Sequence, residues 1–98
     1  MSIMKLLTPY SEYNVSLSWG NYSNGRRALR LIDQEDGLPV MTVTTNVPDE
    51  ELAENELIIK NYSENEGVLD FLLENEIVGP VKRTVFVGRM ECPVVDLL

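Results

Sequence analysis

The sequence contains no histidine, one cysteine (Cys92) and one tryptophan (Trp19). Without histidine, the chain cannot form a Ser-His-Asp triad, a Cys-His pair or the imidazole ligands of most transition-metal sites. A lone cysteine excludes an internal disulfide, and we expect Cys92 to be a small buried hydrophobic residue. Trp19 belongs to an alternating apolar run, so we expect it in the core. These absences argue against an enzyme and against a bound metal or cofactor.

Long hydrophobic runs are also missing, since no segment approaches the roughly 20 apolar residues that a membrane-spanning helix requires. The first apolar cluster, within residues 1–7, is too short for a signal peptide. We therefore expect a cytoplasmic protein without membrane contacts. With 98 residues, 44% of them hydrophobic, the chain suffices for one globular domain, which we expect to include residues 1–98.

Basic residues are few, with 8 Lys and Arg against 16 Asp and Glu, which gives a net charge of −8. Thirteen of the acidic residues lie between Asp33 and Glu76, where Lys60 is the single basic residue. A surface of this charge should repel nucleic acids and anionic lipids and attract basic proteins. The alternative interpretation is a solvated acidic face that only keeps the protein soluble.

Alternating apolar and polar residues in the first half predict three strands, at Tyr13–Trp19, Ala28–Asp33 and Pro39–Thr45. Asn24–Gly25 and Asp36–Gly37 have the composition of tight turns between strands. The acidic run around the second turn lacks the spacing of an EF-hand, so we interpret it as a hairpin turn rather than a calcium loop. An antiparallel meander is therefore expected.

The second half contains the one predicted helix, over residues 64–75. Ser63 and Glu66 have the spacing of a capping box, and apolar residues at helical spacing follow them. Gly79–Pro80 is expected to end the helix.

Further strands are predicted at Glu56–Lys60, Lys82–Val87 and Cys92–Leu98, and a single helical turn at Asp49–Leu52. The last strand is expected at a sheet edge because Pro93 has no N–H to donate. The predicted fold is α+β, with an antiparallel sheet of about five or six strands and one main helix packed on it.

A repeat of acidic residues on the predicted helix is the most specific pattern. Glu66, Asp70 and Glu74 recur every four residues and so share one side of a helix. Like charges at this spacing repel each other, and Glu74 and Glu76 lie at the negative end of the helix dipole. We hypothesise that these carboxylates imitate a row of phosphates and bind basic residues of a nucleic-acid-binding protein. A solvent-facing stripe is the alternative.

The candidate partner-binding residues come from this helix and from the preceding acidic segment. They are Asp49, Glu50, Glu51, Glu54, Glu64, Glu66, Asp70, Glu74 and Glu76. A secondary basic cluster consists of Arg26, Arg27 and Arg30. Together with Lys82, Arg83 and Arg89, this cluster could contact phosphate, protect a strand edge or bind the acidic part of a second copy.

The order of these segments resembles a family of small proteins carried by bacterial plasmids, conjugative elements and phages, whose function is unknown. The residues that carry the resemblance are Tyr13-x-Val15-x-Leu17, Asn24-Gly25-Arg26, Glu35-Asp36-Gly37, the segment 42–48, and Arg83-Thr84 with Gly88. The resemblance implies that the protein acts in the setting of bacterial mobile elements. It implies no catalytic reaction, because it supplies no catalytic residues.

Small acidic proteins of such mobile elements often inhibit host defence by occupying nucleic-acid-binding grooves. We therefore expect a non-enzymatic anti-CRISPR or anti-restriction protein in the bacterial cytoplasm. Its partner would be a basic surface of a host protein or ribonucleoprotein complex, without direct binding of nucleic acid. The alternative is a self-associating structural or assembly module, such as a homodimer.

Overall fold

The computed structural model describes residues 3–8, 11–62 and 65–98. Within them the chain forms β1 (Met4–Leu7), β2 (Glu12–Asn21), β3 (Arg27–Asp33), β4 (Pro39–Thr42), β5 (Glu56–Ile58), α1 (Val68–Glu74), β6 (Arg83–Val87) and β7 (Met90–Asp96). The strands form two sheets, with the orders β1-β2-β3-β4 and β5-β7-β6. The predicted α+β class is confirmed, whereas the single sheet of five or six strands is wrong.

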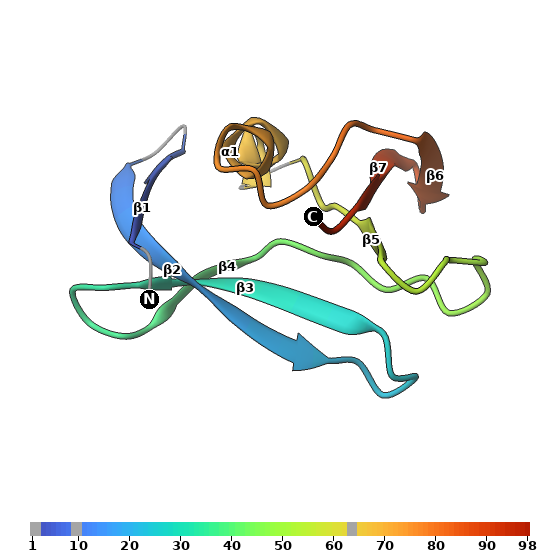
Figure 1. Cartoon of the computed structure of the whole chain (residues 1–98), viewed down its shortest axis with the longest axis horizontal. Coiled ribbons are helices and arrows are strands. Elements are labelled where there is room, and N and C mark those ends of the chain that lie inside the picture. The colour runs from blue at the N-terminus through green and yellow to red at the C-terminus, as the bar shows by residue number, and fades with distance from the viewer. Residues whose placement is uncertain (1–2, 9–10, 63–64) are drawn as a thin grey trace.

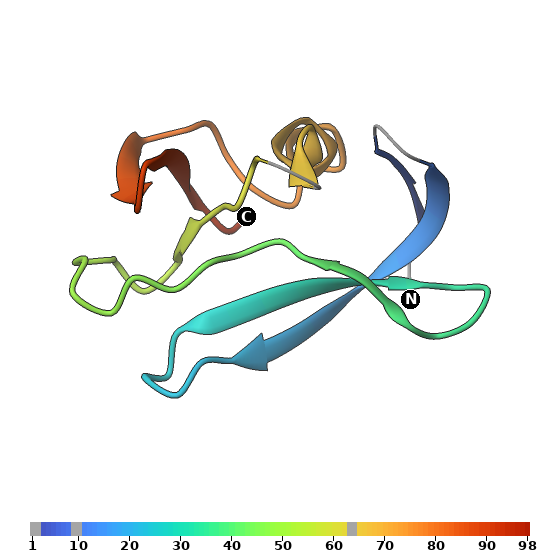
Figure 2. The same ribbon diagram turned by 180° about the vertical axis from the view of Figure 1, so that it is seen from behind.

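The two sheets lie in separate layers (Figure 1). The four-stranded sheet forms one layer, and α1 and the three-stranded sheet form the other, as the view from behind also shows (Figure 2). β1 and the adjoining part of β2 bend toward α1, and β1 contacts it. The main core lies between the layers and includes Val15, Leu29, Leu31, Leu57, Leu72 and Val95.

The β2-β3-β4 meander has the turns that the sequence predicts. Gly25 and Gly37 have positive φ angles of 85° and 72°, in the region that favours glycine. Asp36 Oδ1 accepts a hydrogen bond of 2.9 Å from the backbone N–H of Leu38. The acidic residues of this segment therefore belong to a hairpin turn, as expected.

Two features of this sheet were not predicted. β1 pairs with β2 and buries Leu6, although Lys5 interrupts its apolar residues. β4 ends at Thr42 rather than at Thr45, and Thr44 instead forms an isolated bridge with Ile59 in the other layer. The chain thus leaves the first sheet earlier than its β-branched composition indicates.

β7 is the central strand of its sheet, so the prediction of an edge strand here is wrong. The carbonyl of Pro93 accepts a hydrogen bond of 2.9 Å from the N–H of Ile59, on the side of β5. The N–H that proline lacks would point to that same side. Because the β5 ladder ends at Ile58, the proline costs the sheet little pairing.

α1 begins later than predicted. Its N-cap is Gly67, with φ 90° and no capping side chain, and Glu66 therefore precedes the helix instead of completing a capping box. Ser63, the other residue of the predicted box, lies outside the described residues. Asn61 supplies the missing acceptor, since its Oδ1 receives a hydrogen bond of 3.0 Å from the N–H of Leu69.

α1 also ends earlier than predicted. Its last residue is Glu74, the C-cap is Asn75, and Glu76 has a positive φ of 55°. The helix therefore stops well before Gly79–Pro80, and the predicted range 64–75 is too long. Asn75 stabilises this end, since its side-chain amide donates a hydrogen bond of 2.8 Å to the carbonyl of Phe71.

Candidate functional site

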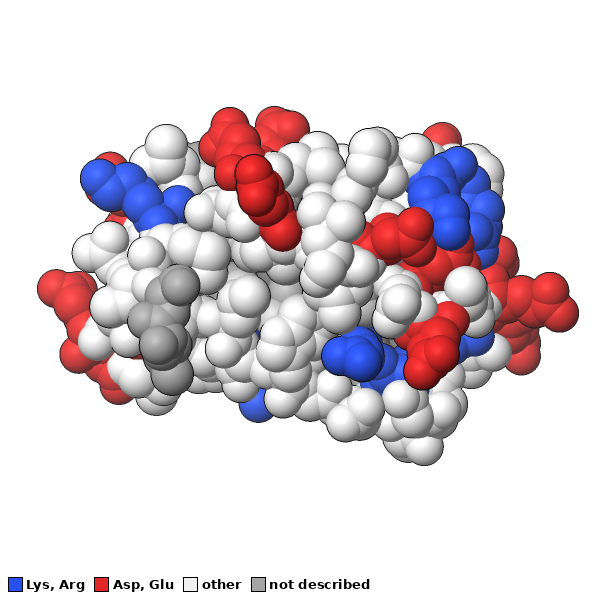
Figure 3. Space-filling view, viewed as in Figure 1, with Lys and Arg blue, Asp and Glu red and all other residues white. Residues whose placement is uncertain are grey.

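The acidic residues, which are neighbours in the sequence, lie in separate places on the folded molecule. On the face shown in Figure 3, one group of acidic side chains covers α1, another lies at the β3–β4 turn, and a third lies near the loop of residues 47–55. The loop and the β3–β4 turn are at opposite ends of the longest axis (Figure 1). The helix and the loop therefore present two distinct acidic surfaces on this face.

The acidic group at α1 consists of Glu66, Asp70, Glu74 and Glu76, all of them exposed. Within the described residues, none of these carboxylates forms an ion pair or a side-chain hydrogen bond. Asp70 and Glu74 are four residues apart on the helix, while Glu66 lies just before it. Glu64 lies outside the described residues. The predicted row of three carboxylates on one helix is therefore reduced to two, with two acidic neighbours.

The second acidic segment is a loop held by arginines rather than the predicted helical turn. The N–H of Glu50 donates to the carbonyl of Val47 at 3.0 Å, which closes a tight turn. Arg26 donates through Nη1 to the carbonyl of Val47 at 2.7 Å and through Nη2 to that of Glu50. Arg83, from the other sheet, donates to the carbonyl of Glu51 at 2.9 Å. Backbone carbonyls of the loop thus bind one arginine from each layer.

Glu56 is the one acidic residue, among those that the structure describes, that the fold buries. Only 7% of it is exposed, and its carboxylate accepts hydrogen bonds from the N–H of Ala53 at 2.8 Å and from Arg83 Nη1 at 2.8 Å. Lys82 Nζ lies 2.7 Å from the same carboxylate. The hydrogen bonds from Arg83 and Lys82 lower the pKa of Glu56 to about 2. This carboxylate therefore remains charged in the folded protein at any ordinary pH.

Lys82 and Arg83 are consequently not available as the basic edge considered from the sequence. Lys82 Nζ also lies 3.3 Å from Asp96 Oδ1, so it bridges two carboxylates. Hydrogen bonding to Glu56 raises the pKa of both Lys82 and Arg83. These two cations are a structural connection between β6, β5 and the loop.

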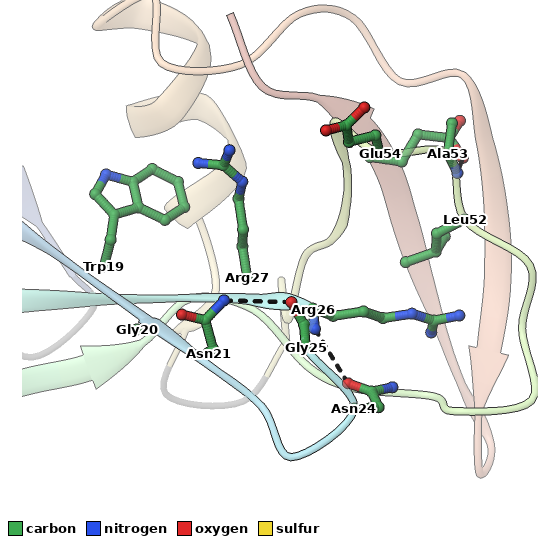
Figure 4. A pocket seen from close by; sticks show the side chains of 11 residues that line it. Trp19, Gly20, Asn21, Asn24, Gly25, Arg26, Arg27, Leu52, Ala53 and Glu54 are labelled. Carbon is green, nitrogen blue, oxygen red and sulfur yellow. Dashed lines mark hydrogen bonds between the residues drawn. The ribbon is translucent and has the colours of Figure 1, made fainter.

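A groove of about 600 Å³ lies between the β2–β3 hairpin and the loop of residues 47–55. Figure 4 shows Trp19 and Arg27 on the hairpin side and Glu54 on the loop side. Trp19 is 40% exposed, so its expected place in the core is wrong. Its side chain does share a face with Val15, as the alternation predicts, but the hairpin extends beyond the main core (Figure 1).

The three arginines of the predicted basic cluster lie in different environments. Arg26 is occupied by the loop carbonyls, and Arg27 lines the groove. Arg30 is three residues further along β3. Because side chains alternate between the two faces of a strand, Arg30 is exposed on the face opposite to that of Arg27. The cluster is therefore not one basic patch, and within the described residues Arg27 has no hydrogen-bonding or ion-pair partner.

Cys92 is buried, as predicted, and burial raises the pKa of its thiol. It packs with Ile58, Val85 and Val94 in a second, smaller cluster on the other face of the three-stranded sheet. No helix in the described ranges is long and apolar enough to cross a membrane.

Comparisons of the chain with models of known protein families, with curated proteins and with solved structures find no match.

Proposed function

We propose that this protein is a non-enzymatic inhibitor that binds a basic, nucleic-acid-binding surface of a bacterial defence complex. The observation that carries the proposal is the acidic group at α1, whose carboxylates are exposed and unpaired within the described residues. A basic partner would supply the cations that these carboxylates lack in the isolated chain.

The position of Glu74 is unfavourable for the helix itself. Asp70 and Glu74 repel each other at a cost of a few tenths of a kcal/mol, roughly, for a pair at this spacing. The last turn contains no basic residue, so Glu74 meets the negative end of the helix dipole without compensation. Asp70, in the first turn, is favoured by the dipole. A function in binding explains why Glu74 occupies the last turn, where a lysine would stabilise the helix.

The class of partner follows from two arguments. A net charge of −8 disfavours nucleic acid as a ligand and favours a protein surface that itself binds phosphates. The resemblance to small proteins of plasmids, conjugative elements and phages supplies the setting, in which host restriction enzymes and CRISPR complexes are the basic targets.

The test measures target-DNA cleavage by purified restriction endonucleases and CRISPR effector complexes in the presence of the protein. We expect inhibition that weakens steeply between low and moderate salt, because exposed charge pairs are screened over about 8–10 Å. The variant D70N/E74Q should lose most of the inhibition, while D49N/E51Q, which removes the same number of charges from the separate loop surface, serves as the matched control. Inhibition that persists unchanged in half-molar salt, or in the helix variant, would contradict the electrostatic contact at α1.

A self-associating module is the second candidate, and the edge strand β6 favours it. β6 pairs with β7 on one side, and Phe86 on this strand is 69% exposed, with Val81 and Met90 also exposed nearby. An open strand edge with apolar side chains is a common place for a second chain to pair. Light scattering after size exclusion distinguishes the candidates, since a stable dimer at low concentration supports self-association and a monomer supports the inhibitor.

A further inference from the structure

The groove between the hairpin and the loop contains functional groups that neither the core nor the acidic surface at α1 uses. Its volume of about 600 Å³ lies within the range of small-molecule sites. Three side chains project into it without a described partner, an indole from β2, a guanidinium from β3 and a carboxylate from the loop (Figure 4). They are Trp19, Arg27 and Glu54.

Arg27 and Glu54 carry opposite charges on opposite walls, yet they form no ion pair. Both walls are fixed, because Arg27 belongs to a paired strand and the loop is held by Arg26 and Arg83. In Figure 4 the carboxylate of Glu54 is directed toward the side of the groove on which Arg27 lies. A ligand that carries both an anion and a cation would satisfy both charges.

Trp19 completes this arrangement with an aromatic surface beside Arg27 (Figure 4). An indole that is 40% exposed at the wall of a groove offers a face on which a flat ring can stack. The order along the groove is therefore aromatic ring, cation and anion. A ligand that matches it has a ring at one end and, at the other end, a carboxylate and an ammonium group on one carbon, of which the carboxylate faces Arg27 and the ammonium faces Glu54.

We propose that the groove binds a free aromatic α-amino acid. The ring stacks on Trp19, the α-carboxylate accepts hydrogen bonds from Arg27, and the α-ammonium donates to Glu54. Arg–carboxylate pairs can be bidentate, which would orient the ligand. A nucleic acid strand is disfavoured because a neighbouring hollow of the same loop is lined by Asp49 and Glu51, which would repel phosphates beside the groove.

This proposal goes beyond the inhibitor function and does not depend on α1. Its test is a titration by calorimetry and by the fluorescence of Trp19, the single tryptophan, with L-phenylalanine as the probe. Two analogues remove one charge each, since phenethylamine lacks the carboxylate and 3-phenylpropionate lacks the ammonium. We expect saturable binding of phenylalanine, and binding of each analogue weaker by about threefold to tenfold.

Matched variants assign each charge to its residue. R27Q should lower the affinity for phenylalanine about threefold to tenfold and leave the affinity for phenethylamine unchanged. E54Q should lower the affinity for phenylalanine and leave the affinity for 3-phenylpropionate unchanged. R30Q, on the opposite face of β3, is the control and should change nothing. All three positions are exposed, and thermal unfolding confirms that the variants fold. The proposal is overturned if phenylalanine shows no saturable binding, or if R30Q weakens it as much as R27Q does.

Discussion

Glu56 illustrates how one side chain can join several parts of this chain. Its carboxylate contacts Arg83 at the start of β6, Lys82 just before that strand, and the N–H of Ala53 in the loop. The sequence gives no sign of this role, because Glu56 is one of 13 acidic residues in its segment and Arg83 is 27 positions away. All three positions of β5 are buried, so no alternation of polar and apolar residues separates Glu56 from its exposed neighbours.

The low pKa of Glu56 predicts how stability depends on pH. The pKa is about 2 in the folded protein and near its ordinary value of 4.5 in the unfolded chain. Between these values the unfolded chain binds a proton that the folded protein does not, so the free energy of unfolding falls as the pH falls. The contribution of Glu56 is complete above about pH 5 and is lost progressively toward pH 2.

Urea unfolding at a series of pH values measures this dependence. We expect E56Q to be less stable than the wild type at pH 7 and to lose less stability on acidification. E12Q is the matched control, because Glu12 pairs with Lys5 at the exposed surface, 3.0 Å away. Equal acid sensitivity of E56Q and the wild type would show that other carboxylates control the acid response.

Trp19 and Arg27 show how far the site itself could be predicted. The Asn24–Gly25 turn fixes the register of the hairpin, in which Asn21 pairs with Arg27 and Trp19 with Leu29. The sequence therefore contained the juxtaposition of the indole and the guanidinium on one face. The sequence does not show how far the core extends along this hairpin, because that depends on where the second layer ends. Trp19 was for this reason expected in the core.

At the scale of elements, strands joined by short turns were predictable and long-range pairings were not. The meander depends on local alternation and on glycines that accept positive φ, so its three strands are confirmed. β7 depends instead on pairing with β5, which is more than thirty residues earlier in the chain. Because proline has no N–H to donate, the sequence predicted β7 at a sheet edge. The sequence alone does not show that the β5 ladder ends beside Pro93, where the missing N–H costs little.

α1 gives a prediction at this scale, because its first turn relies on a residue outside the helix. The Oδ1 of Asn61 accepts the hydrogen bond from the N–H of Leu69, so the variant N61A leaves this N–H without an acceptor. We expect a loss of about 1 kcal/mol in the free energy of unfolding, the usual value of a capping side chain. Chemical unfolding measures it.

The control for this prediction is N55A, since Asn55 is an exposed asparagine whose backbone carbonyl, and not its side chain, accepts a described hydrogen bond from Leu97. It should change stability by less than about 0.5 kcal/mol, as surface substitutions do. If N61A and N55A were equally stable, the side chain of Asn61 would not be capping α1.

For the molecule as a whole, the loop of residues 47–55 is the connection that makes two sheets into one structure. Val47 and Leu52 pack on the smaller cluster of the three-stranded sheet. Arg26 reaches the same loop from the four-stranded sheet. The loop therefore covers an apolar face on one side and forms the wall of the groove on the other.

This arrangement predicts that a substitution of Arg26 lowers the stability of the protein more than a substitution of the other arginines in the predicted basic cluster. The variant R26Q leaves two loop carbonyls without their charged donor, and we expect the free energy of unfolding to fall by about 1–3 kcal/mol, because hydrogen bonds to charged groups contribute about that much. A protease that cleaves after glutamate should also cut the loop at Glu50 and Glu51 several times faster in R26Q. R30Q, which removes the same charge from an exposed position of β3 that does not contact the loop in the described residues, should leave both the stability and the rate of cleavage unchanged. Cleavage at the wild-type rate in R26Q would mean that the apolar contacts of Val47 and Leu52, rather than the arginine, hold the loop.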